Sequence, residues 1–133
     1  MSESLHVLII EDSELDAKVL EGLLKAGGYE VTARRVETAA QMNDELNAGL
    51  FDLILADYNL PEFNAPEALR LLQESGRDLP FIVISGGIGE DMAVRIMKSG
   101  AHDYLMKGNL ARLVPAVGRE VREARERATH RDT

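Results

Sequence analysis

Cysteine and tryptophan are both absent from this sequence of 133 residues. Without cysteine the chain has no disulfide framework, no thiolate nucleophile and no cysteine-based metal site. The lack of disulfides fits a cytoplasmic protein, which is the location we expect. Aromatic residues make up only 5% of the chain, whereas hydrophobic residues make up 45%, so aliphatic side chains and alanine must fill the core.

Long apolar runs and an excess of positive charge are missing as well. No apolar run approaches the roughly 18 residues that predict a membrane span, and the first residues, MSESLH, lack the pattern of a signal peptide. The net charge is −8, whereas a broad nucleic-acid surface needs lysine and arginine. We therefore expect no membrane and no nucleic-acid partner. The length predicts a single domain over 1–133, with a core of about 5–126 and a charged tail at 127–133.

Five segments of the chain have the patterns of β-strands. Leu5–Ile10, Leu53–Ala56 and Pro80–Ile84 are continuous apolar runs, which are typical of strands buried on both faces. Tyr29–Val36 and His102–Lys107 mix polar with apolar residues, which indicates edge strands. The sequence therefore predicts three central strands and two edge strands.

A helical pattern follows each predicted strand. Ser13 with Asp16 and Thr38 with Gln41 resemble capping boxes at the starts of the first two helices, and the last helix is expected to begin around Pro115. Strands that alternate with helices predict a parallel sheet covered on both faces. The fold class that places the continuous runs in the middle is α/β, a flavodoxin-like (βα)5 doubly wound sheet with strand order 2-1-3-4-5.

Polar residues stand where four of the predicted strands end, and these residues are Glu11, Asp12, Asp57, Ser85 and Lys107. Three clustered carboxylates repel one another unless a positive charge lies among them, and Mg²⁺ favours one or two carboxylates together with phosphate oxygens. With Mg²⁺ in place, Asp57 could attack a phosphorus atom and carry the phosphoryl group as an acyl phosphate. Lys107 and Ser85 would then contact the new phosphoryl oxygens.

Taken singly, each of these residues also has a purely structural explanation. Glu11 and Asp12 suit a helix N-terminus, and Asp57 could cap the next helix. Ser85 could be a turn residue, and Lys107 a surface lysine. All of them are expected at one edge of one sheet, and this coincidence favours a shared site.

This ordered set of residues resembles the receiver domain of two-component response regulators. The set comprises the Glu11-Asp12 pair after the first strand, Asp57 with Pro61 four residues later, Ser85 after the fourth strand and Lys107 after the fifth. The resemblance extends over residues 5 to 126. It is specific as an ordered set, although each motif alone is weak.

The resemblance implies that Asp57 accepts phosphate from the phosphohistidine of a sensor histidine kinase or a histidine phosphotransfer protein. It also implies Mg²⁺ as the cofactor. By matching position, Asp12, Asp57 and the main-chain carbonyl of Asn59 would bind the ion directly, and Glu11 would act through water.

The resemblance further implies a switch rather than an enzyme that turns over a substrate. Ser85 would move to the phosphoryl group and Tyr104 would turn inward, which changes a face made of the fourth helix, fifth strand and fifth helix. No DNA-binding segment follows residue 126, so we expect output through an unidentified partner protein. The chain could be a free-standing adaptor or a domain of a hybrid kinase.

The sequence departs from the family pattern at four places. Gly108 follows Lys107 where the family usually has a proline in a cis bond, which is improbable before glycine. Gly86-Gly87 replaces a commoner small-then-larger pair, Tyr58 replaces an apolar residue, and Pro115 delays the last helix. These differences affect the expected output face more than the acceptor chemistry.

Two other functions compete with the receiver interpretation. A phosphohydrolase with an aspartyl nucleophile usually needs a second acid two residues after the nucleophile, where this chain has Asn59. A flavodoxin-like FMN binder needs a phosphate loop rich in serine and threonine after the first strand, where Glu11 and Asp12 would repel phosphate. Turnover of a phosphomonoester would support the first, and a coloured purified protein the second.

Overall fold

The computed structural model describes residues 3–87 and 89–131, so the two residues at each end of the predicted domain lie outside the described part. Five strands alternate with five α-helices, and a short 3-10 helix precedes the last one. The elements are β1 (Glu3–Ile10), α1 (Glu14–Ala26), β2 (Tyr29–Val36), α2 (Ala39–Ala48), β3 (Leu53–Asp57), α3 (Ala65–Ser75), β4 (Phe81–Ser85), α4 (Gly89–Lys98), β5 (Asp103–Met106), η1 (Leu110–Arg112) and α5 (Leu113–Arg131).

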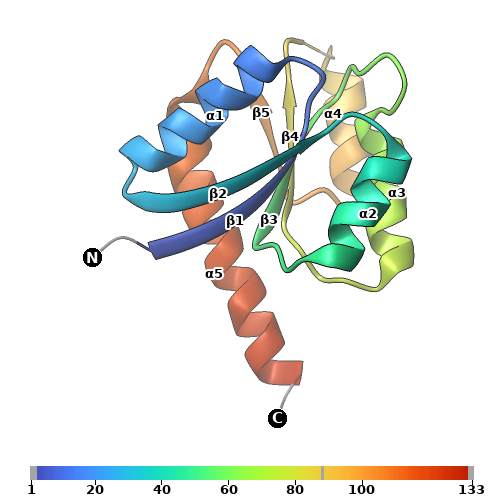
Figure 1. The fold of residues 1–133 in the computed structure, drawn as a ribbon. Coiled ribbons are helices and arrows are strands. Elements are labelled where there is room, and N and C mark those ends of the chain that lie inside the picture. Colours follow the sequence, from blue (N-terminus) through green and yellow to red (C-terminus); the bar gives the residue numbers. More distant parts are fainter. Residues whose placement is uncertain (1–2, 88, 132–133) are drawn as a thin grey trace.

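All five strands are parallel and lie in the order β2-β1-β3-β4-β5, which confirms the predicted topology. The helices α1 and α5 cover one face of this sheet, and α2, α3 and α4 cover the other (Figure 1). β2 and β5 are the edge strands, as their mixed sequences predicted. The arrangement is therefore the doubly wound flavodoxin-like fold.

The hydrophobic core lies in two layers, one on each face of the sheet. β3 and β4 are buried at every position, as expected for continuous apolar runs. Because successive side chains of a strand point to opposite faces, Ile54 and Phe81 join the layer beneath α2 and α3, whereas Leu55 and Ile82 join the layer beneath α1 and α5. The two layers hold the central strands in a fixed register.

Side-chain caps fix the starts of the first two helices. The Ser13 hydroxyl accepts a hydrogen bond from the Asp16 amide at 3.1 Å, and the Thr38 hydroxyl accepts one from the Gln41 amide at 3.1 Å. The Gln41 side chain accepts from the amide of Glu37, at 2.8 Å, rather than from Thr38. Both expected N-terminal caps are therefore present, and they fix where each chain segment leaves the sheet.

The starts of two elements differ from the sequence-based expectation by two residues. β1 begins at Glu3 rather than Leu5, because β2 is long enough to pair with it from Tyr29 onward. α5 begins at Leu113 rather than Pro115, because a helix tolerates proline in its first turn, where no N–H is needed.

The last helix extends well past the sheet. α5 continues to Arg131, so residues 127–131 of the expected charged tail are helical, and its end projects from the body of the molecule (Figure 1). Arg127 binds the carboxylate of Asp78 at 3.0 and 3.2 Å. Across the described residues, no helix combines the length and the apolar character that spanning a bilayer demands.

Candidate functional site

The polar residues singled out in the sequence meet at the carboxyl edge of the sheet. β1 leads into Glu11 and Asp12, β3 ends in Asp57, β4 ends in Ser85, and Lys107 follows β5. Because the strands are parallel, all these ends share one edge, and the chain turns in opposite directions after β1 and β3. Open α/β sheets form their ligand sites at such a switch point.

Three carboxylates form the acidic centre of this edge. One carboxylate oxygen from each of Glu11, Asp12 and Asp57 lies within 4.8 Å of the other two. Glu11 and Asp57 are only 2% and 8% exposed, whereas Asp12 is open to solvent. Like charges at this spacing disfavour one another, and their hard oxygen atoms suit Mg²⁺. The donor set therefore fits a divalent cation.

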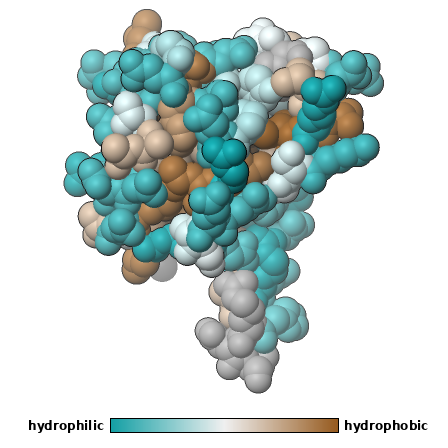
Figure 2. All heavy atoms as spheres, turned by 90° about the vertical axis from the view of Figure 1, so that its right-hand side faces the viewer, coloured by the Kyte–Doolittle hydropathy of each residue, from teal (hydrophilic) through white to brown (hydrophobic). Residues whose placement is uncertain are grey.

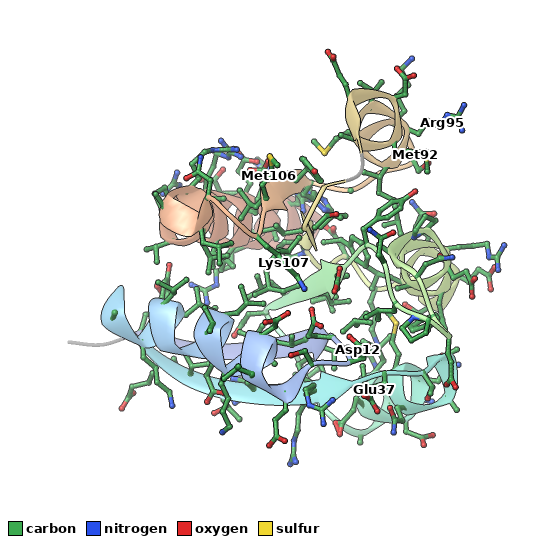
Figure 3. All side chains as sticks on the ribbon, turned by 90° about the horizontal axis from the view of Figure 1, so that it is seen from above. Asp12, Glu37, Met92, Arg95, Met106 and Lys107 are labelled. Atoms are coloured by element: carbon green, nitrogen blue, oxygen red, sulfur yellow. The ribbon has the colours of Figure 1, made fainter. Side chains whose placement is uncertain are left out.

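Lys107 supplies the positive charge beside these acids. Its Nζ atom lies 3.0 Å from Asp57 Oδ2, 3.3 Å from Glu11 Oε2 and 2.8 Å from Asp16 Oδ2. Figure 3 shows its side chain pointing to the middle of the sheet edge, whereas Arg95 points outward from α4. Burial alone would lower the pKa of Lys107, but hydrogen bonds to Asp16 and Asp57 raise it above its ordinary value. The ammonium is therefore charged at neutral pH.

The Glu11 carboxyl lies deepest among the three acids. Its Oε1 atom accepts a hydrogen bond from the Ser13 amide at 3.0 Å. Burial raises its pKa from 4.5 to about 7, and the neighbouring Asp57 and Asp12 add to this rise, while the Ser13 amide opposes it. In the metal-free protein, Glu11 therefore changes its charge near neutral pH.

This raised pKa predicts a pH-dependent stability of the metal-free protein. Between pH 4.5 and about 7 the folded state keeps a proton on Glu11 that the unfolded chain has lost. The folded state then binds more protons, so the free energy of unfolding falls as the pH rises through this window. The loss attributable to Glu11 is at most about 3 kcal/mol.

Urea unfolding in the presence of a chelator, at several pH values across this window, measures the effect. The control is Glu11→Gln, which removes the titrating group but keeps the side-chain size. We expect the free energy of unfolding of the wild type, relative to that of Glu11→Gln, to fall steadily as the pH rises across the window. A difference that stays constant with pH would contradict the assigned origin.

Hydrogen bonds from main-chain amides order the loops of this edge. The fully buried hydroxyl of Ser85 accepts from the Gly87 amide at 3.1 Å, and the Ser85 carbonyl accepts from the Lys107 amide at 2.8 Å. The Asn59 amide donates to Asp57 Oδ1 at 3.2 Å. The ends of β3, β4 and β5 therefore hold their side chains in a defined arrangement.

Tyr104 lies in β5, away from the loops themselves. It is half-buried, packs against the core, and lines a hollow of about 470 Å³ together with Val94 and Met97 of α4.

The peptide bond between Lys107 and Gly108 is trans, in line with the expectation for a bond before glycine.

Two charged residues at the site were not predicted from the sequence. The sequence pattern indicates Asp16 only as a helix-capping partner, yet its carboxylate binds Lys107. Arg35, at the carboxyl end of β2, donates from Nη1 to the carbonyls of Glu11 and Asp12, at 3.2 and 3.5 Å. The available signal was position: Asp16 lies one turn after the acidic pair, and Arg35 is the last residue but one of β2, the strand beside β1.

A hollow of about 730 Å³ lies elsewhere, near the amino end of β3. His6, Arg34, Leu50 and Phe51 are among the residues that line it. Among the residues that the structure describes, the clustered carboxylates lie at the opposite edge and not at this hollow. Chemistry rather than hollow size therefore identifies the site.

Comparisons with known proteins agree with this geometry. The family model described as response regulator receiver domain matches residues 7–117. The two-component response regulator ARR15 of Arabidopsis thaliana is 33% identical over 117 residues, which cover 80% of this chain and 57% of the relative. The cell cycle transcriptional regulator CtrA of Caulobacter vibrioides is 33% identical over 104 residues, which cover 77% of this chain and 44% of that protein. The chain thus spans less than two thirds of either relative.

A solved structure with a similar fold is the receiver domain of a sensor histidine kinase from Pseudomonas aeruginosa. It superimposes with a TM-score of 0.72 at 27% sequence identity, over 89% of this chain and 98% of that one. That protein has a magnesium ion coordinated in its active-site cleft.

Proposed function

The chain belongs to the family of response regulator receiver domains, and from this premise we propose that Asp57 is its phosphoacceptor. Receiver domains are phosphoacceptor signalling modules that histidine kinases or phosphotransfer proteins phosphorylate. The observation that carries the proposal is the position of the Asp57 carboxylate, which lies beside two further acids and 3.0 Å from the Lys107 ammonium.

The acidic cluster is our candidate for the Mg²⁺ site that is typical of the family. In this proposal, Asp12, Asp57 and the carbonyl of Asn59 bind the ion directly, and Glu11 acts through water. The short separation of the three carboxylates and the all-oxygen donor set support it. When bound, the ion neutralises charge on the transferring phosphoryl oxygens.

In the proposed transfer, Asp57 is the nucleophile and Lys107 stabilises the phosphoryl group. An oxygen of Asp57 attacks the phosphorus of the donor phosphohistidine, and the P–N bond breaks. The electron pair of that bond stays on the imidazole nitrogen, the N–H on the other ring nitrogen leaves the histidine neutral, and an acyl phosphate remains on Asp57. Lys107, whose ammonium lies beside the acceptor oxygen, donates hydrogen bonds to the phosphoryl group.

Phosphorylation would then act on a face of the molecule that does not include the acids. We propose Ser85 and Tyr104 as the switch pair, and α4, β5 and α5 as the face that binds an output partner. Val94, Met97 and Met106 expose 46%, 40% and 48% of their surface on α4 and β5, which supports a docking role. Seen from the side of α2–α4, apolar patches interrupt a mostly hydrophilic surface (Figure 2).

Mass spectrometry tests the acceptor function directly. Incubation with acetyl phosphate and Mg²⁺ is expected to add the mass of one phosphoryl group, and a chelator in excess is expected to prevent this. Neutral hydroxylamine should remove the group, because it cleaves acyl phosphates but not phosphate esters. A mass increase that also occurs with the chelator present, or that remains after hydroxylamine treatment, would contradict the proposal.

A further inference from the structure

Asp16 is a fourth acid at the site and the partner that lies closest to Lys107. The distance from Lys107 Nζ is 2.8 Å to Asp16 Oδ2, against 3.0 Å to Asp57 and 3.3 Å to Glu11. A lysine ammonium has three N–H donors. Each of these three acids can therefore accept one of them.

The position of Asp16 is fixed independently of the lysine. Its main-chain amide donates to the Ser13 hydroxyl at 3.1 Å, which places it in the first capped turn of α1. Its side chain is not one of the three clustered acids that fit a cation. Asp16 can therefore still accept a hydrogen bond from Lys107 when Asp57 binds Mg²⁺ and Glu11 contacts the ion through water.

The Lys107 ammonium needs a partner that holds it in place. Its side chain is a flexible four-carbon chain and is 31% exposed. Gly108 follows it directly, and glycine leaves the chain free to adopt many conformations. The hydrogen bond from the Lys107 amide to the Ser85 carbonyl fixes the backbone at Lys107, but it does not fix the ammonium at the end of the side chain.

We propose that Asp16 is a positioning residue for phosphorylation, which holds the Lys107 ammonium beside Asp57 so that it meets the incoming phosphoryl oxygens. The inference rests on the proposed function of Asp57. Asp16 does not touch the phosphoryl group and acts through Lys107. Asp16 therefore affects the rate of phosphoryl transfer and not the affinity for Mg²⁺.

The test compares initial rates of phosphorylation by acetyl phosphate over a range of Mg²⁺ concentrations. Asp16→Ala is expected to lower the maximal rate about two- to five-fold, the range for a partly exposed ion pair. The Mg²⁺ concentration at half-maximal rate should stay the same. The matched control is Glu14→Ala, since Glu14 is an acid in the same turn of α1, is exposed, and has no partner among the described residues. We expect the control to keep the wild-type rate.

A second pair of proteins separates positioning from a general effect of charge or folding. In a Lys107→Ala background, adding Asp16→Ala should change the rate no further, because the group that Asp16 holds is gone. An equal loss in both backgrounds, a faster rate, an unchanged rate, or a shift in Mg²⁺ dependence alone would each overturn the positioning role. A wild-type protein that accepts no phosphoryl group would instead overturn the proposed function, and this inference with it.

Discussion

Replacing Asp57 by asparagine is expected to abolish phosphoryl labelling of this chain by acetyl phosphate and Mg²⁺. Asparagine keeps the size of the side chain but offers a neutral amide in place of the carboxylate oxygen that would attack phosphorus. The substitution also removes one of the negative charges that surround Glu11. We therefore expect the variant to fold normally while losing essentially all of the label.

The measurement is the mass increase of intact protein, with circular dichroism to confirm the fold. Asp91→Asn provides the control, because Asp91 is an exposed acid in the first turn of α4 and lies outside the carboxylate cluster. This control should be labelled like the wild type. Equal labelling of wild type and Asp57→Asn would assign the phosphoryl group to another residue.

Replacing Phe81 by alanine is expected to lower the free energy of unfolding by about 3–5 kcal/mol. Phe81 is completely buried at the start of β4, in the core layer beneath α2 and α3. Its removal leaves a cavity that the paired neighbour Ile54 cannot fill. Since a domain is stable by only about 5–15 kcal/mol, the loss would be a large share of the total.

Urea unfolding followed by far-ultraviolet circular dichroism measures this loss, because the chain has no tryptophan. Leu50→Ala is the control, since Leu50 is 84% exposed. Its substitution should change stability by no more than about 0.5 kcal/mol. Similar losses in the two variants would mean that Phe81 does not contribute to the core as its burial indicates.

Much of the fold was predictable because its strands and helices have clear local patterns. The apolar runs at Leu53–Ala56 and Pro80–Ile84 became two of the three central strands, and the mixed run at Tyr29–Val36 became an edge strand. The boundaries were less predictable, because they depend on neighbours. The extra length of β1 comes from pairing with β2.

Helical spacing alone did not show which apolar side chains of α1 are buried. Leu20 and Leu24 are in the core, whereas Leu15 and Val19 are 73% and 47% exposed. The spacing of apolar residues indicates a helix. Which side of that helix touches the sheet depends on how α1 packs on the sheet and alongside α5.

The order of residues along the chain sets which side chains follow the carboxyl ends of the strands. Alternating strands and helices force those ends to one edge, so Glu11, Asp12, Asp57 and Lys107 could be assigned to one region before any coordinates. The distances between their atoms depend on the folded arrangement of the chain. It brought Asp16 of α1 to within 2.8 Å of Lys107, 91 residues away in the chain. Local patterns set secondary structure, whereas contacts between distant segments depend on how helices pack on the sheet.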